Sequence, residues 1–321
     1  MTRRGDRLRA CAARLFDART MARVVDPAIA DLQAERPSLV AYVAVLKVIV
    51  LCGLGGSMPM FQSWSDDDRA TLRRAAGVCV VALPLLTAFI AWPLFRFGAL
   101  SGRAGPVGVA LTLLPFALGL SVPMALTFGI AFGLGGRMVS RRLVQAVILV
   151  ALVSSFASVV NAGWIAPAAN QMFRVARASE VGIAPESLRP NASEMSSPEL
   201  RQHIRQVTAT GQASAAEIRT LEMTYASRWA MAFSPIALAM FMLSVVAWPS
   251  MRRWFAGISA LVAVLGYYGA GNFGRSVMLA GDTSAFLVGA WLPNAVFVAL
   301  AGALLALSAR RQGARPSPAA S

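Results

Sequence analysis

The sequence predicts an all-α polytopic membrane protein with six to seven transmembrane helices and a short helical insert on the outer side. Of its 321 residues 57% are apolar and only 14% are charged, whereas a soluble domain carries about 25% charged residues. The apolar residues also come in blocks of about 20, the length that an α-helix needs to cross the hydrocarbon core of a membrane. These observations exclude a soluble globular enzyme.

Seven segments are candidates for membrane-spanning helices, and the last six contain no Asp, Glu, Lys or Arg. The first is short, rich in Gly and carries Lys47 near its middle. The candidate spans are residues 39–56, 76–95, 107–136, 143–166, 229–247, 254–274 and 285–308. They divide the chain into a polar, amphipathic N-terminal region (1–38), an ambiguous hydrophobic segment with its loop (39–75), transmembrane helices (76–166), a helical outer insert (167–228), further transmembrane helices (229–309) and a disordered tail (310–321).

Clusters of Arg predict the orientation, since cytoplasmic loops of membrane proteins carry an excess of basic residues. Such clusters follow the third, fifth and seventh apolar segments, so these sites should be cytoplasmic and the insert 167–228 should lie outside. The N-terminus lies outside if residues 39–56 span, and in the cytoplasm if they form a re-entrant or interfacial segment. Residues 1–38 carry eight Arg against five acidic residues, which favours the cytoplasmic alternative. Because the basic residues sit between apolar blocks, the net charge of +15 does not indicate nucleic-acid binding.

The outer insert carries the signals of two helices. The tripeptide Ser197–Glu199 (Ser-Pro-Glu) is typical of a helix start, with an N-cap hydroxyl at Ser197, a proline in the first turn and an acid at the positive end of the dipole. Gly211 is the expected C-cap of this helix. A second helix is expected to begin near Ser214 and to run through Arg228 into the membrane, with a kink at Pro235.

Four stretches of the chain resemble the LptF/LptG family of lipopolysaccharide-export permeases. They match the family's entry into its fourth membrane helix, its exit from the third, the start of its last and, less specifically, its second helix. The stretches are Met195-Ser196-Ser197-Pro198-Glu199-Leu200-Arg201 with Ile204 and Gly211, Trp164-Ile165-Ala166-Pro167-Ala168-Ala169-Asn170-Gln171, Ala290-Trp291-Leu292-Pro293-Asn294, and Pro115 to Gly133. The resemblance covers residues 76–308 and six spans in the family's order.

The resemblance implies half of the membrane core of an ABC transporter in a bacterial inner membrane. Family members pair with a second permease subunit, bind a separate cytoplasmic ATPase and extract lipopolysaccharide from the outer leaflet. The chain contains no GxxxxGK[ST] phosphate loop, as that division of labour requires. We therefore expect a lipid or lipopolysaccharide substrate, no enzymatic activity of the chain itself, and no cofactor.

The sequence departs from the family pattern in two places. Family members carry a periplasmic jellyroll domain between the third and fourth helices, and here that domain is lacking because the insert has only about 60 residues. Their acidic coupling helix, which the ATPase grips, is replaced by the short basic loop 134–143. The alternative to a transporter subunit is a non-transporting membrane partner that retains the permease helices. An integral-membrane enzyme is less favoured, because the last six spans contain no acidic residue and no His.

Basic residues near the membrane are the candidate lipid contacts, and we expect no catalytic, cofactor-binding or metal-ligating residue. Arg binds phosphate groups with two parallel hydrogen bonds, and a charge inside a membrane segment suggests a functional site. The alternative is anchoring at the headgroup level or snorkelling to the interface. Four Asn in or near the spans are expected to form interhelical hydrogen bonds. The lipid-contact candidates are Lys47, Arg174, Arg177, Arg228 and Arg275, and the Asn residues are Asn161, Asn170, Asn272 and Asn294.

Overall fold

The computed structural model divides the chain into two units, Met1–Arg73 and Arg74–Ser321, each of which is described by itself. The structure describes residues 9–10, 12–13, 18, 21–34, 64–99, 106–180, 191–248, 251–280 and 286–313. In the first unit a π-helical turn η1 (Met21–Val25) leads into α3 (Asp26–Ala34). The Arg9 guanidinium binds the Asp26 carboxylate at 2.7 Å at the start of α3. The candidate span 39–56 lies outside the described residues, so both alternatives, a membrane span and a re-entrant or interfacial segment, stay predictions.

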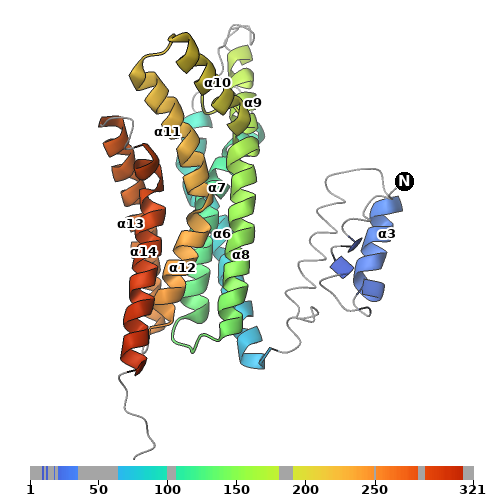
Figure 1. The fold of residues 1–321 in the computed structure, drawn as a ribbon. Helices are drawn as coiled ribbons and strands as arrows, with labels where there is room; N and C mark the ends of the chain where they lie inside the picture. Colours follow the sequence, from blue (N-terminus) through green and yellow to red (C-terminus); the bar gives the residue numbers. More distant parts are fainter. Residues whose placement is uncertain are drawn as a thin grey trace, which may run out of the picture. The chain divides into compact units, whose positions relative to one another are not determined.

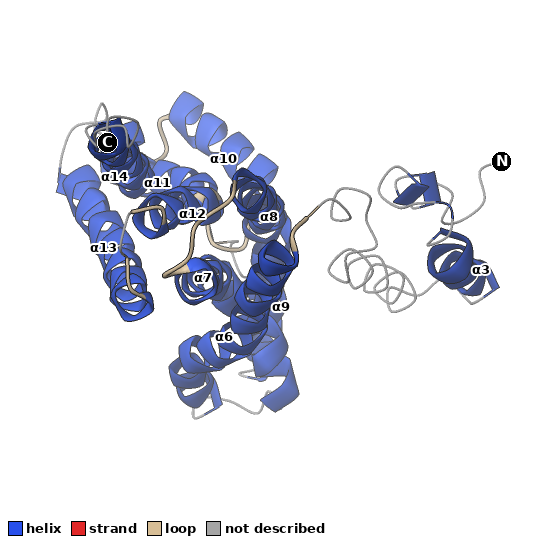
Figure 2. Cartoon of the chain, turned by 90° about the horizontal axis from the view of Figure 1, so that it is seen from below, coloured by secondary structure: helices blue, strands red, loops and turns tan. Residues whose placement is uncertain are grey.

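The second unit is a helical bundle, and no strand occurs in the described part of the chain (Figures 1 and 2). Five of its helical stretches are long and apolar enough to cross a membrane, and a bent pair makes a sixth. This confirms the predicted fold class for all six candidate spans that fall within the described residues. The helices are α6 (Asp66–Ala99), α7 (Pro106–Leu134), α8 (Arg141–Val160), η2 (Asn161–Ile165), α9 (Ala166–Glu180), α10 (Ser197–Thr210), α11 (Ala215–Ala232), α12 (Ser234–Val246), α13 (Arg253–Ala280) and α14 (Phe286–Gly313).

The third span in the described region is longer than the sequence predicts. Its candidate limits are 143–166, but α8, η2 and α9 form one continuous stretch in which Arg141–Val175 qualifies as a span. Ser140 is the N-cap of α8, and its hydroxyl accepts a hydrogen bond from the backbone N–H of Leu143 at 3.2 Å. The first part of the predicted insert is therefore helical and continuous with the helix of this span.

The rest of the insert is the predicted helical pair, α10 and α11. The N-cap of α10 is Ser196, one residue earlier than predicted, and the Glu199 carboxylate accepts from the Ser196 backbone N–H at 2.7 Å. Gly211 ends α10 with a φ of +63°, in the left-handed region that glycine adopts without strain. Ser214 caps α11 in the same way, because its backbone N–H donates to the Glu217 carboxylate at 2.7 Å. The predicted bend at Pro235 is confirmed as a 43° break between α11 and α12.

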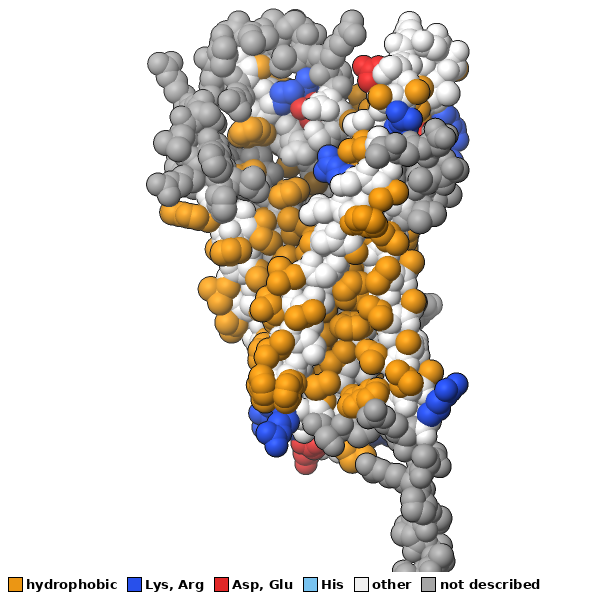
Figure 3. All heavy atoms as spheres, turned by 90° about the vertical axis from the view of Figure 1, so that its left-hand side faces the viewer, with side chains coloured by type: hydrophobic (Ala, Val, Ile, Leu, Met, Phe, Trp, Pro, Cys, Tyr) orange, Lys and Arg blue, Asp and Glu red, His pale blue; other side chains and the backbone are white. Residues whose placement is uncertain are grey.

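The core of the second unit lies where α7, α12, α13 and α14 meet. Ile130, Leu238 and Met242 are fully buried there, and the ring of Phe297 makes edge contacts with Phe241 and Tyr267 at centroid distances of 5.1 and 5.6 Å. The outer helix faces expose many large apolar side chains instead. Figure 3 shows one such face, with apolar side chains over its middle and charged side chains toward its ends, as a membrane-embedded bundle requires.

Candidate functional site

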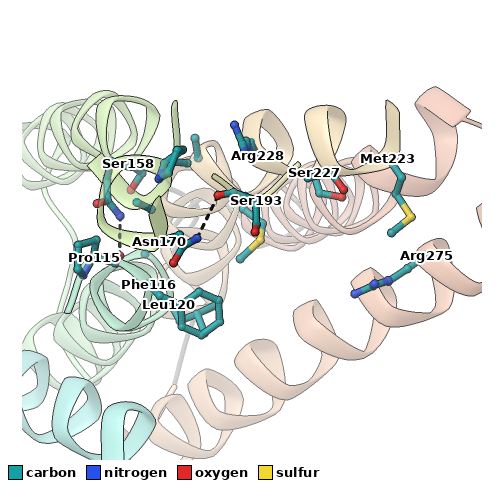
Figure 4. A pocket seen from close by; sticks show the side chains of 18 residues that line it. Pro115, Phe116, Leu120, Ser158, Asn170, Ser193, Met223, Ser227, Arg228 and Arg275 are labelled. Atoms are coloured by element: carbon teal, nitrogen blue, oxygen red, sulfur yellow. Dashed lines mark hydrogen bonds between the residues drawn. The ribbon is translucent and has the colours of Figure 1, made fainter. Parts of the chain in front are cut away.

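A cavity of about 430 Å³ opens between α7, the α8–η2–α9 stretch, α11 and α13 (Figure 4). It lies at the end of the bundle that carries the insert, which is the predicted outer side. Its wall is apolar with a few polar groups, the composition typical of ligand sites. The residues that line it are Pro115, Phe116, Gly119, Leu120, Ser158, Asn161, Ala162, Ala166, Pro167, Asn170, Ser193, Met223, Thr224, Ser227, Arg228, Met231, Ala232 and Arg275.

Three irregular helix segments meet at this cavity. Pro115 interrupts the hydrogen bonding within α7, and the π-helical turn η2 lies between α8 and α9. On the third side Met231 and Ala232 form the last residues of α11 before its break. Irregular backbone at membrane depth occurs where it is buried in protein or lines a cavity, and π-helical turns are frequent at functional sites. The arrangement therefore marks this cavity as the candidate functional site.

Two Asn side chains connect the irregular segments. The Asn161 amide in η2 donates from Nδ2 to the carbonyl oxygen of Pro115 at 2.7 Å, joining η2 to α7. The Asn170 amide in α9 donates to the carbonyl oxygen of Ser193 at 3.1 Å, joining α9 to the segment before α10. The interhelical hydrogen bond predicted for Asn161 is confirmed, whereas Asn170 binds a turn instead of another helix. Both residues also line the cavity. Asn272, by contrast, is exposed on α13.

Arg228 is built into the cavity wall. Its two terminal nitrogens donate to the backbone carbonyls of Met195 at 2.7 Å and Ala192 at 2.6 Å. These bonds fasten the segment before α10 onto α11. A charged guanidinium bound to two carbonyls contributes roughly 1.5–3 kcal/mol per hydrogen bond, so Arg228 acts as a clamp between two parts of the wall.

Arg275 lies on the opposite side of the cavity, and its side chain extends from α13 toward it (Figure 4). The residue is exposed, and within the described residues no hydrogen bond or ion pair holds its guanidinium. It is the cation that a ligand in the cavity can reach without breaking an existing contact. Among the three lipid-contact candidates whose side chains the structure describes, it brings together Arg228 and Arg275.

Of the other three candidates only Arg174 has a described side chain, and it does not line the cavity. Arg174 forms an ion pair at 2.7 Å with Glu194, whose side chain is only 8% exposed, so this Arg holds the segment before α10 against α9. Arg177 lies on α9, and its side chain falls outside the described part of the structure, as does the whole of Lys47. Among the described residues no three His, Cys, Asp or Glu side chains lie close enough together to hold a metal.

Sequence reasoning missed two tyrosines beside the cavity. The hydroxyl of Tyr268 donates to the carbonyl oxygen of Leu120, a lining residue, at 3.2 Å. The hydroxyl of Tyr267 donates to Asn294 on α14 at 2.8 Å. A pair of tyrosines inside an apolar span was the available signal, because a buried phenol needs a hydrogen-bond partner.

Residues 184–307 match the model of a protein family described as "Lipopolysaccharide export system permease LptF/LptG". The match includes α10 to α13, most of α14, and the wall of the cavity from Ser193 to Arg275. No curated protein sequence matches the chain. The family resemblance predicted for residues 184–307 is confirmed, and its extension to residues 76–183 stays a prediction.

Proposed function

We propose that the chain, whose residues 184–307 match the LptF/LptG family of lipopolysaccharide-export permeases, is a membrane subunit of an ABC-type exporter of lipopolysaccharide or a related lipid. It resides in a bacterial inner membrane and pairs there with a second permease subunit. The energy comes from ATP hydrolysis by a separate cytoplasmic protein. The chain itself catalyses no reaction.

The observation that carries this proposal is the cavity with Arg275 at its wall. An exported amphiphile presents acyl chains and an anionic headgroup, and the cavity offers an apolar wall together with a basic side chain on the predicted outer side. Arg is suited to phosphate because its planar guanidinium donates two parallel hydrogen bonds. Lipid contact therefore falls to Arg275, and Arg228 shapes the wall against which the lipid lies.

The cytoplasmic loop between α7 and α8 favours the alternative of a non-transporting partner. Only Gly135–Ser140 separate the two helices, and this loop holds no acidic residue. It is fixed against the start of α13, since the Arg253 side chain donates from Nε to the carbonyl oxygen of Gly135 at 3.3 Å. An ATPase that drives this permease has to engage this compact basic loop or another cytoplasmic part of the chain.

Purification of the tagged protein from its native membrane distinguishes the two functions. A transporter subunit is expected to co-purify with a second permease and an ABC ATPase, and its depletion is expected to trap lipopolysaccharide in the inner membrane. A non-transporting partner retains the permease without the ATPase. Unchanged lipopolysaccharide export after depletion would contradict the proposed function.

A further inference from the structure

The break between α11 and α12 leaves helix carbonyls without their usual partners. Phe233 separates the two helices with φ −89° and ψ −4°, and Pro235 has no backbone N–H to donate. In an unbroken helix that N–H would bind the carbonyl oxygen of Met231. The hydroxyl of Ser234 takes its place and donates to this oxygen at 2.7 Å.

A side chain from another helix binds the break as well. Asn294 on α14 donates from Nδ2 to the carbonyl oxygen of Ala230 at 2.8 Å, and its Oδ1 accepts from the hydroxyl of Tyr267 on α13 at 2.8 Å. A carbonyl can only accept, which fixes the orientation of the amide. Asn294 is 7% and Tyr267 3% exposed. Both hydrogen bonds are therefore shielded from water, and neither partner has a solvent molecule to replace it.

The residues on the outer side of the break belong to the cavity. Met231 and Ala232 line it, and Arg228 lies about one turn earlier on the same helix. A change in the bend would move Arg228, and more so the lining residue Met223 further along α11, relative to α7 and α13. Met231 and Ala232 lie next to the break and would move least. At 1.5 Å per residue, the 18 residues of α11 span about 27 Å, so halving the 43° bend would move the outer end of α11 by about 10 Å.

We propose that Tyr267 and Asn294 are positioning residues that hold the break between α11 and α12 at its observed angle. They thereby set how far the lining residues Met223 and Arg228 of α11 lie from the opposite wall of the cavity. Tyr267 anchors the Asn294 amide from α13, and Asn294 anchors the break from α14. Neither side chain lines the cavity, so both act through the backbone of α11. The consequence for lipid binding rests on the proposed function, whereas the consequence for the bend does not.

A distance measured across the break tests this inference. Spin labels at Ala215→Cys on the outer end of α11 and Leu305→Cys on α14 report the bend by double electron–electron resonance, and both residues are exposed. Cys11, Cys52 and Cys79 are replaced by Ala in this background. The test variants are Tyr267→Phe and Asn294→Leu in the full chain without added lipid. Tyr268→Phe is the matched control, because it removes the neighbouring half-buried hydroxyl, which binds Leu120 on α7 and not Asn294.

The parent protein and the Tyr268→Phe control are expected to share one narrow distance distribution. Tyr267→Phe should broaden it or shift it by several ångströms, and Asn294→Leu should do so further because it removes both hydrogen bonds. A distance distribution in Tyr267→Phe that equals that of the parent protein would overturn the proposal. A change in Tyr268→Phe as large as that in Tyr267→Phe would overturn it too. If Asn294→Leu does not fold, Tyr267→Phe decides alone. Lipopolysaccharide binding, measured separately on the parent protein, tests the proposed function without affecting this result.

Discussion

At the scale of single residues, the structure separates two arginines that the sequence treats alike. Arg228 and Arg275 both follow from the same rule, a basic side chain beyond an outward-facing helix end. The rule cannot tell which guanidinium is already bound, since the carbonyls of Met195 and Ala192 come close to Arg228 only in the folded chain. The same holds for Arg174, whose partner Glu194 is 20 residues away in sequence.

Arg275→Gln is expected to weaken lipopolysaccharide binding about tenfold or more and to leave the thermal unfolding midpoint unchanged. The loss follows from one charge-assisted hydrogen bond to phosphate, which contributes roughly 1.5–3 kcal/mol. Binding is measured on purified protein in vesicles with and without lipopolysaccharide. Arg205→Gln is the control, because Arg205 is an exposed Arg on α10 that does not line the cavity. Equal binding by both variants would contradict the role of Arg275.

Arg228→Ala is expected to act on stability instead. It removes two charge-assisted hydrogen bonds to the half-buried carbonyls of Met195 and Ala192, and a fully buried unsatisfied group would cost about 1–3 kcal/mol. The unfolding midpoint should therefore fall, and protease should cut the segment before α10 more readily. An unfolding midpoint identical to that of Arg205→Ala would show that the two hydrogen bonds of Arg228 do not stabilise the wall of the cavity.

The stability of the helical pair α10 and α11 is expected to depend on pH through Glu199. The hydrogen bonds that its carboxylate accepts from Ser196 hold its pKa below the usual range. A depressed pKa stabilises the folded helical pair above the unfolded value of about 4.3, and this stabilisation is lost as the pH falls toward the folded value. Amide exchange in the first turn of α10, corrected for its intrinsic rate, should accelerate below about pH 4.3. Glu199→Gln should abolish that acceleration, and a variant that keeps it would contradict this assignment.

At the scale of elements, most helices could be predicted because their signals are local. Apolar runs predicted the six described spans, Gly211 predicted the end of α10, and Pro235 predicted the bend between α11 and α12. The π-helical turn η2 could not be predicted, since one extra residue in a helix leaves no periodic trace in an apolar run. The continuation of this helix beyond residue 166 was missed because Pro167, a residue that usually ends or kinks a helix, lies at the start of α9.

The contact between α6 and α7 depends on small residues at GxxxG spacing. A side chain at Gly133 would meet the backbone of Ala75, and one at Gly129 would meet the Cys79 thiol. Gly133→Ala is therefore expected to push α6 away and to lower stability by roughly 1–3 kcal/mol, the usual cost of overpacking. Thermal unfolding in lipid nanodiscs measures it. Gly77→Ala on α6 is the control, because no atom lies within 4 Å of the position of its new Cβ. An equal loss of stability in both variants would contradict the role of Gly133 in the contact between α6 and α7.

At the scale of the whole molecule, the proposed lipid site is assembled from distant parts of the chain. The cavity joins residues from α7 to α13, which are more than 150 positions apart between Pro115 and Arg275. No single stretch of the sequence predicts such a site. The family match begins at residue 184, so the α7 and α9 walls of the cavity became visible only in the structure.

Site-specific photo-crosslinking from the cavity tests the central claim most directly. A photoreactive amino acid replaces Met231, which lines the cavity, or Met172, which is 70% exposed on α9 and does not. In native membranes we expect lipopolysaccharide to crosslink at Met231 and Arg275→Gln to reduce this product about tenfold, while any lipid product at Met172 stays unchanged. An absence of lipopolysaccharide at Met231, or a product that does not respond to Arg275→Gln, would contradict a lipid site in this cavity.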